Sequence, residues 1–289
     1  MSSFVTWIKG VLASLALGLN TVIGVGLLLP VALVKLLLPF DAVRRVVDPC
    51  LNAIATQWIA FNTRWMAWVG DTRWDVQGLE GLDPRGWYLV SSNHRSWVDI
   101  LVLQRVFNRR IPMLKFFLKR ELIWVPVIGL AWWALDFPFM QRRGGASGVR
   151  DLARARRACE KFSLVPTSVI NFLEGTRFTP AKRAAQQSPY THLLKPKVGG
   201  LATAVATLGS QFHKLLDVTV VYPDGAPTFW TLLSGQLRAV TVRVEQREIP
   251  AELLAGDYGD TSFRRNMQDW INGMWADKDA LIARLIAAR

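Results

Sequence analysis

His94 and Asp99 are a histidine and an aspartate whose types and spacing suit proton transfer to or from a hydroxyl group. They lie in residues 91–99, where an apolar, strand-like run gives way to a helix-like pattern. On a regular helix, side chains at this spacing point about 140° apart, so the two meet only if His94 precedes the first turn. Ser96 is a typical N-cap residue and places the helix start after His94. Asp99 then accepts the Nδ1 proton of His94 and leaves Nε2 free to act as a base.

A second group of functional residue types follows another apolar run and consists of Glu174, Gly175, Thr176 and Arg177. Gly175 permits a tight turn because it lacks a Cβ atom. The planar guanidinium of Arg177 offers a fork of donors that suits phosphate, and Glu174 is expected to orient that fork. Both groups also have a structural interpretation, as an isolated His–Asp pair and as a surface salt bridge that contributes little to stability.

Both groups resemble motifs of the glycerolipid acyltransferases. Asn93 and His94 together with Asp99 are similar to the N-H-x4-D motif of that family, and residues 174–177 are similar to its E-G-T-R motif. The resemblance is greatest to lysophosphatidic acid acyltransferases of the PlsC type and covers residues from about 85 to 225. Further similarity to the family lies in residues 119–122 with Pro126 and Gly129, in residues 139–142, in residues 190–200 and in residues 220–223.

The resemblance implies both a fold and a reaction. The fold is a mixed α/β sheet flanked by helices. The reaction transfers a fatty acyl group from a coenzyme A or acyl-carrier-protein thioester to the free hydroxyl of lysophosphatidic acid, giving phosphatidic acid. His94 would take the hydroxyl proton, Asp99 would stabilise the imidazolium, and a backbone amide near the helix start is expected at the thioester oxygen. Because a thioester is already activated, neither a metal nor a cofactor is expected.

The resemblance also implies which residues bind the acceptor, with Arg177 on its phosphate. The expected binding residues are Asn93, Glu174, Gly175, Thr176, Arg177 and Arg142. The sequence departs from many members at Phe139-Met140-Gln141-Arg142, where those members have an Ile-Asp pair before the arginine.

Other functions fit parts of the sequence. Within the family, the acceptor is alternatively another lysophospholipid or glycerol 3-phosphate. A serine or cysteine hydrolase is disfavoured because the G-x-S-x-G motif is absent, residues 145–148 having the wrong spacing, and neither Cys50 nor Cys159 follows a strand in polar surroundings. A non-catalytic membrane scaffold explains the composition but gives the residues 93–99 no role.

The N-terminal segment predicts membrane contact. Residues 10–34 are uncharged, and this run of 25 exceeds the roughly 20 residues that a helix needs to cross a bilayer. Gly24, Gly26 and Pro30 leave open whether it spans or kinks and returns. A cleaved signal peptide is the alternative, but no small-residue cleavage site follows the run. Lys35 and the arginines after it place the next domain on the cytoplasmic side, and the short anchor fits a bacterial inner membrane.

Two further apolar segments carry several tryptophans. Six apolar residues at spacings of 3 and 4 from Leu51 to Trp68 form one helical stripe, which indicates either a membrane interface or a core-facing helix. Residues 122–135 are uncharged but too short to span a bilayer, and are expected to be buried or to lie on the surface near it. As a hypothesis, this segment lines the acyl-chain groove.

The rest of the chain alternates between strand and helix patterns, which favours an α/β domain. Strands are predicted at residues 87–91, 167–173, 217–222 and 240–244, and helices at residues 99–107 and over the last thirty residues. We therefore divide the chain into a membrane-anchoring helical segment at residues 1–70 and an acyltransferase catalytic domain at residues 71–289.

Composition identifies the kind of partner. Of 289 residues, 51% are hydrophobic and 20% are charged, with a net charge of +13, so the polar surface is basic and suits an anionic partner. The 13 tryptophans and the uncharged N-terminal run favour anionic membrane lipids over nucleic acid, which is not expected as a partner.

Overall fold

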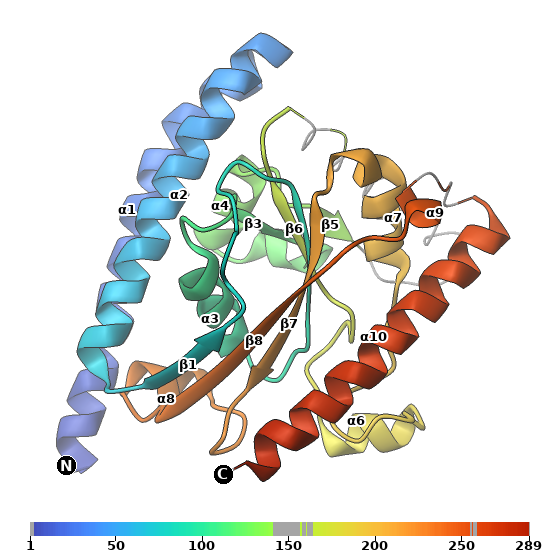
Figure 1. Ribbon diagram of the computed structural model, residues 1–289. Helices are drawn as coiled ribbons and strands as arrows, with labels where there is room; N and C mark the ends of the chain where they lie inside the picture. The colour runs from blue at the N-terminus through green and yellow to red at the C-terminus, as the bar shows by residue number, and fades with distance from the viewer. Residues whose placement is uncertain are drawn as a thin grey trace.

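The protein is described by a computed structural model that covers residues 3–140, 157, 160, 164–254, 256 and 259–288 (Figure 1). The helices are α1 (Ser3–Leu37), α2 (Asp41–Val69), α3 (Val98–Phe107), η1 (Arg120–Trp124), α4 (Ile128–Ala134), α6 (Pro180–Ala185), α7 (Gly199–Leu208), η2 (Gly209–Gln211), α8 (Phe229–Leu233), α9 (Ala251–Leu254) and α10 (Thr261–Ala287). The strands are β1 (Arg73–Gln77), β2 (Tyr88–Ser92), β3 (Leu114–Phe116), β4 (Leu118–Lys119), β5 (Phe139–Met140), β6 (Ser168–Phe172), β7 (Lys214–Val221) and β8 (Ala239–Arg247).

The central sheet has six strands in the order β1-β8-β7-β2-β6-β3. Strands β7, β2, β6 and β3 are parallel to one another, whereas β8 is antiparallel to β7 and parallel to β1. This mixed sheet confirms the expected fold class. All five residues of β2 are buried, because helices cover both faces of the sheet and a strand between them needs apolar residues on both sides.

Two apolar cores lie on opposite faces of the sheet. Side chains alternate between the faces along a strand, so Val90 and Ile170 face one core while Leu89 and Val169 face the other. The first core is covered by α1 to α4 and the second by α7 and α10 (Figure 1). The helix after β2 and the terminal helix thus occur where the sequence patterns predict them.

Helices α1 and α2 run side by side in opposite directions along one side of the sheet (Figure 1). Helix α1 continues through Pro30 and does not turn back on itself; the return is made by α2. In the described part of the chain, α1 is the one helix long and apolar enough to cross a membrane, and only 17% of its most apolar window is buried.

A buried ionic cluster fixes the junction of the two helices. Lys35 Nζ lies 2.9 Å from Asp48 Oδ1 and 2.7 Å from Asp136 Oδ2, and Arg44 lies 3.0 Å from the same Asp136 oxygen. Helices α1 and α2 also share the first core with α3 and α4, so they are packed onto the sheet rather than separated from it. The division at residue 70 coincides with the end of α2 and remains an interpretation.

The tryptophan-bearing segments lie partly at the surface. Along the predicted stripe of α2, Leu51 and Trp65 are buried, whereas Trp68 is 72% exposed, because the buried face of this helix is rotated away from the stripe. In residues 122–135, Ala131 is buried against α1 and Trp124 is 83% exposed. This second segment therefore lies on the surface with one side buried.

Candidate active site

The turn after β2 brings His94 and Asp99 together. His94 Nδ1 lies 2.8 Å from Asp99 Oδ2. The same carboxylate oxygen accepts hydrogen bonds from the backbone N–H groups of Arg95, at 2.6 Å, and Ser96, at 2.9 Å. The side chain of Asp99 is fully buried, while that of His94 is 13% exposed. Asp99 therefore fixes the imidazole ring, and the ring remains accessible from outside.

The start of α3 explains how the two side chains meet. The Ser96 hydroxyl accepts a hydrogen bond from the Val98 N–H at 3.1 Å, and Ser96 donates its own N–H to Asp99. These two hydrogen bonds hold the backbone just before α3, so His94 lies before the first helical turn. The helix itself begins at Val98, one residue before the predicted range, and its cap position is held by Trp97 and not by Ser96.

Most backbone N–H groups at this turn, where a donor to the thioester oxygen was expected, already have acceptors within the protein. The backbone N–H groups of Arg95, Ser96 and Val98 already donate to Asp99 and to Ser96. The N–H of His94 donates to Glu174 at 2.7 Å. These four amides donate to acceptors within the protein, so the expectation of an amide donor near the helix start stays a prediction that they do not support.

Asn93 is a structural clamp between neighbouring strands. Its side-chain amide donates to the carbonyl of Val220 at 2.9 Å, and its carbonyl accepts the Val220 N–H at 2.8 Å. The residue is fully buried. Asn93 thus holds the backbone just before His94 against β7, and both polar groups of its side chain are paired within the protein.

Glu174 was expected to orient Arg177, but its carboxylate binds backbone amides instead. Its two carboxylate oxygens accept the backbone N–H groups of His94, at 2.7 Å, and Leu194, at 2.9 Å. Burial raises the pKa of Glu174 to about 7, although both backbone hydrogen bonds and the charge of Arg95 oppose this rise. Glu174 therefore positions the turn that carries His94.

The turn after β6 presents Arg177 to the surface. Gly175 has a φ of +68°, the left-handed conformation that glycine adopts at no steric cost. The Thr176 hydroxyl accepts a hydrogen bond from Lys182 Nζ at 2.8 Å. Arg177 is exposed, and its guanidinium lies 5.1 Å from the ring centre of Trp97, beside the His94 turn. Arg142 lies outside the described residues.

Several residues of the site have no strong signal in the sequence. The Tyr222 hydroxyl donates to Asp99 Oδ1 at 2.6 Å, and the ring of Phe172 stacks on His94 with centroids 4.1 Å apart. Arg95 packs over Phe178 and donates to the carbonyl of His192 at 3.1 Å. The resemblance of residues 220–223 to a family motif was the one signal for Tyr222. In the described part of the chain, no cluster of three or more histidine, cysteine or acidic side chains could hold a metal.

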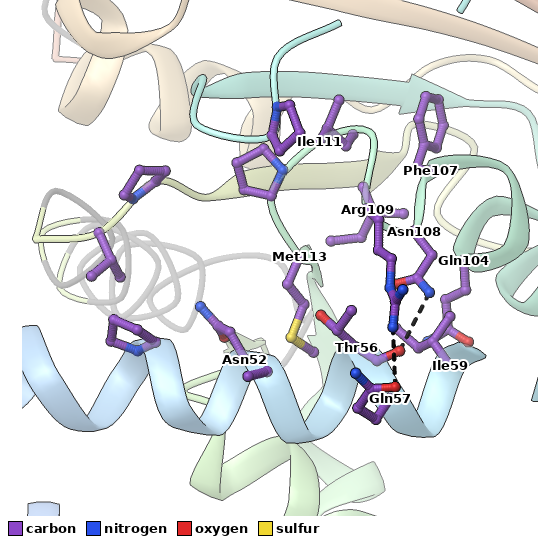
Figure 2. A pocket seen from close by; sticks show the side chains of 17 residues that line it. Asn52, Thr56, Gln57, Ile59, Gln104, Phe107, Asn108, Arg109, Ile111 and Met113 are labelled. Carbon is purple, nitrogen blue, oxygen red and sulfur yellow. Dashed lines mark hydrogen bonds between the residues drawn. The ribbon is translucent and has the colours of Figure 1, made fainter. Parts of the chain in front are cut away.

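A separate cavity of about 570 Å³ lies between α2 and the end of α3 (Figure 2). Figure 2 shows Arg109 donating to Gln57 at 3.1 Å and Asn108 donating to the carbonyl of Thr56 at 3.3 Å across it. The cavity lies at the N-terminal ends of β3 and β6, whereas His94 follows the C-terminal end of the parallel strand β2. Its described lining residues include no acid, histidine or cysteine, so we do not place acyl transfer there.

Comparisons with known proteins cover the part of the chain that holds both turns. The Acyltransferase family model matches residues 73–223, which include both turns. The 1-acyl-sn-glycerol-3-phosphate acyltransferase 2 of Brassica oleracea is 27% identical over 217 residues, covering 69% of this chain and 52% of that relative. The gamma enzyme of Mus musculus is 28% identical over 204 residues, covering 67% of this chain and 52% of that relative. The chain thus spans about half the length of these relatives.

The fold is also found in a solved structure. The crystal structure of the 1-acyl-sn-glycerophosphate acyltransferase PlsC from Thermotoga maritima superposes with a TM-score of 0.53 and 16% sequence identity, over 94% of this chain and 98% of that one. At this identity the likeness supports the arrangement of sheet and helices alone.

Proposed function

This chain belongs to the acyltransferase family, and from that premise we propose that it transfers a fatty acyl group from a coenzyme A or acyl-carrier-protein thioester to the free hydroxyl of lysophosphatidic acid. The observation that carries the proposal is the His94–Asp99 pair, with His94 accessible and Asp99 fully buried. The relatives named as 1-acyl-sn-glycerol-3-phosphate acyltransferases support the acceptor.

His94 acts as the general base in this proposal. With Nδ1 bound to Asp99, Nε2 takes the proton as the acceptor hydroxyl attacks the thioester carbonyl. The carbon–sulfur bond then breaks, and the leaving thiolate takes the proton from the imidazolium, so the products are an ester and a free thiol. Proton transfer of this kind contributes on the order of 10²–10⁴-fold to a rate.

Asp99 and Tyr222 keep the base in its working state. The Asp99 carboxylate stabilises the imidazolium that forms when Nε2 is protonated. Burial, together with the charge and hydrogen bond of Asp99, raises the pKa of Tyr222 well above its usual value. Tyr222 therefore stays protonated and donates to Asp99 over the working pH range.

Arg177 is the proposed phosphate contact. Its guanidinium is exposed beside the turn of His94, held against Trp97 and facing no ion-pair partner among the described residues. A phosphate bound by this fork would place the acceptor hydroxyl within a single complex with His94, which reduces the entropic part of the barrier. We keep Arg142 as a proposed acceptor contact on the resemblance alone.

The membrane supplies the acceptor in this proposal, and α1 provides the contact. Large apolar side chains of α1 are exposed along its length, and exposed side chains of the η1–α4 segment extend this apolar surface because α4 packs on α1. These side chains include Phe4, Trp7, Leu15, Leu19, Leu27, Leu33, Trp124, Leu130 and Trp133. The basic net charge favours anionic lipids, and we propose a bacterial inner membrane with the site on its cytoplasmic side.

An apolar path leads from His94 toward α1 and is the proposed acyl-chain groove. The ring of Phe172 stacks on that of His94. The ring centroids of Phe116 and Phe172 lie 6.0 Å apart, and those of Phe137 and Phe116 lie 6.3 Å apart. Phe137 lines a narrow apolar pocket between α1, α2 and α4, together with Trp132. Trp132→Ala should shift the preferred acyl chain toward greater length. The same preference in this variant and in Leu135→Ala would exclude the groove.

The first test is transfer of a labelled acyl group from acyl-coenzyme A to lysophosphatidic acid by the full chain in vesicles. We expect phosphatidic acid from the wild type and a loss on the order of 10²–10⁴-fold in His94→Ala. Other lysophospholipids, glycerol 3-phosphate and an acyl-carrier-protein donor form the second arm. Activity that survives both His94→Ala and Asp99→Asn would favour a scaffold, and acyl release to water would favour a hydrolase.

A further inference from the structure

The C-terminal helix α10 lies on the sheet face opposite α1 to α3, and two of its side chains bind the backbone of residues 188–197 (Figure 1). Trp275 Nε1 donates to the carbonyl of Leu194 at 2.9 Å. The Asp279 carboxylate accepts the N–H groups of Thr191, at 2.8 Å, and His192, at 2.7 Å. Trp275 is fully buried, so its hydrogen bond is formed away from water.

Residues 188–197 in turn reach the catalytic turn at two points. The N–H of Leu194 donates to one oxygen of Glu174 at 2.9 Å, and the other oxygen accepts the N–H of His94 at 2.7 Å. The carbonyl of His192 accepts the guanidinium of Arg95 at 3.1 Å. A continuous series of hydrogen bonds therefore joins α10 to the backbone N–H of His94 and to the side chain of Arg95.

This pattern exceeds what covering an apolar core requires. Phe263, Met267 and Ile271 of the same helix are buried and make apolar contacts that would hold α10 on the sheet. Trp275 and Asp279 add polar contacts that converge on one short segment, and a carboxylate that accepts two adjacent amides fixes the orientation of that segment.

We propose that Trp275 and Asp279 are positioning residues for acyl transfer, which hold residues 188–197 so that Glu174 and Arg95 keep His94 in place. Both lie more than 175 positions from His94 and outside the residues 73–223 matched by the family model. The catalytic consequence rests on the proposed function, whereas the mechanical link does not.

Hydrogen exchange of the full chain in detergent tests the mechanical link without any assay of activity. Asp279→Ala removes both acceptors and keeps a good helix former, and Trp275→Phe removes one N–H donor and keeps most of the packing. Asp269→Asn and Trp270→Phe are the matched controls, because they lie on the same helix and make no side-chain hydrogen bond in the described structure. Peptides covering residues 91–99, 188–197 and 239–247 are compared.

We expect faster exchange at residues 188–197 and 91–99 in Asp279→Ala and Trp275→Phe, with residues 239–247 and both controls unchanged. Faster exchange at residues 188–197 alone would overturn the link to His94. Uniformly faster exchange, including residues 239–247, would show that the two side chains serve only general stability. No change in either variant would show that the hydrogen bonds hold nothing in place.

Kinetics of acyl transfer then test the catalytic consequence. Displacing the base should lower kcat by about 10-fold in Asp279→Ala, while KM for the acceptor stays within about twofold, since the described contacts of Asp279 do not include the Arg177 side chain. Asp279→Glu, which retains a carboxylate, should recover most of kcat. Changed exchange at residues 91–99 with unaltered kcat would overturn the positioning role, and inactivity of the wild type toward every acceptor would instead refute the proposed function.

Discussion

The two turns that form the candidate site differ in how firmly the protein holds their functional side chains. After β2, the Asp99 carboxylate accepts hydrogen bonds from His94, two backbone amides and Tyr222, all between 2.6 and 2.9 Å. After β6, Arg177 is exposed and rests against one aromatic ring at 5.1 Å. Hydrogen bonds therefore fix the proposed base, whereas the proposed phosphate contact is not fixed in this way.

This difference fits the roles proposed for the two groups. A base must meet a hydroxyl proton at a set distance and angle, so hydrogen bonds that fix it in advance save reorganisation during the reaction. An arginine that binds an incoming headgroup must first release water and adapt to the ligand, and an exposed side chain does this at little cost. The two turns thus separate fixed geometry from adaptable binding.

The largest expected effect breaks the fixed side of this comparison. In Asp99→Asn the amide oxygen can still accept from His94 while the amide nitrogen faces Tyr222, so the ring stays in place but loses the negative charge that stabilises the imidazolium. We expect kcat to fall on the order of 10²–10⁴-fold with little change in KM for the acceptor. Steady-state kinetics measure the change, and an equal rise in KM would contradict it.

Glu174 tests whether the turn after β6 also has a fixed part. Burial raises its pKa to about 7 from the ordinary 4.5, so between these pH values the folded protein binds more protons than the unfolded chain. The contribution of Glu174 to the free energy of unfolding is therefore fully present below the unfolded pKa of 4.5 and is lost as pH rises through about 7. As pH falls from 7.5 to 4.5, the free energy of unfolding of the wild type should rise by up to about 3 kcal/mol relative to that of Glu174→Gln.

Chemical denaturation of both proteins across this pH range measures the difference. The same difference in the free energy of unfolding between the two proteins at every pH would show that the pKa of Glu174 is not raised in the folded protein.

Arg177 tests the adaptable side. Arg177→Gln removes charge-assisted hydrogen bonds to the acceptor phosphate, which typically contribute about 1.5–3 kcal/mol, so KM for lysophosphatidic acid should rise roughly 10- to 100-fold. Stability should hardly change, because the side chain is exposed. Arg265→Gln on the exposed face of α10 is the matched control for the loss of one charge. A fall in kcat at constant KM would place Arg177 among the fixed residues.

What the sequence predicts correctly is local. The apolar runs that form β2, β6, β7 and β8 and the helix after His94 are set by patterns a few residues long, and the His94–Asp99 contact forms because His94 precedes the first turn of α3. Both the contact between Ser96 and Val98 and the contact between His94 and Asp99 join residues that are at most five positions apart.

What the sequence does not predict depends on contacts between distant residues. Glu174 was expected to orient Arg177, three positions away, but it binds amides 80 and 20 positions away. No pattern in one sequence ties Trp275 to Leu194, because the contact exists only after the sheet has formed. The face of α2 that is buried likewise depends on how α1 and the sheet pack, and the tryptophan stripe alone does not fix it.

Tyr222 provides the smallest and most discriminating test of the fixed side. Tyr222→Phe removes the hydroxyl that donates to Asp99 Oδ1 at 2.6 Å and changes little else in the packing of this buried ring. Asp99 keeps its three hydrogen bonds through Oδ2, so the imidazole should stay in place while one buried oxygen loses its partner. We expect kcat to fall about 10-fold and stability to fall by about 1–3 kcal/mol.

The double variant Tyr222→Phe/Asp99→Asn separates this contact from general packing. If Tyr222 acts through Asp99, its removal should cost much less activity in the Asp99→Asn background than in the wild type, because the charge that it supports is already gone. Additive losses would mean that Tyr222 acts on the site by another route, and that the fixed geometry of His94 depends on Asp99 and the backbone amides alone.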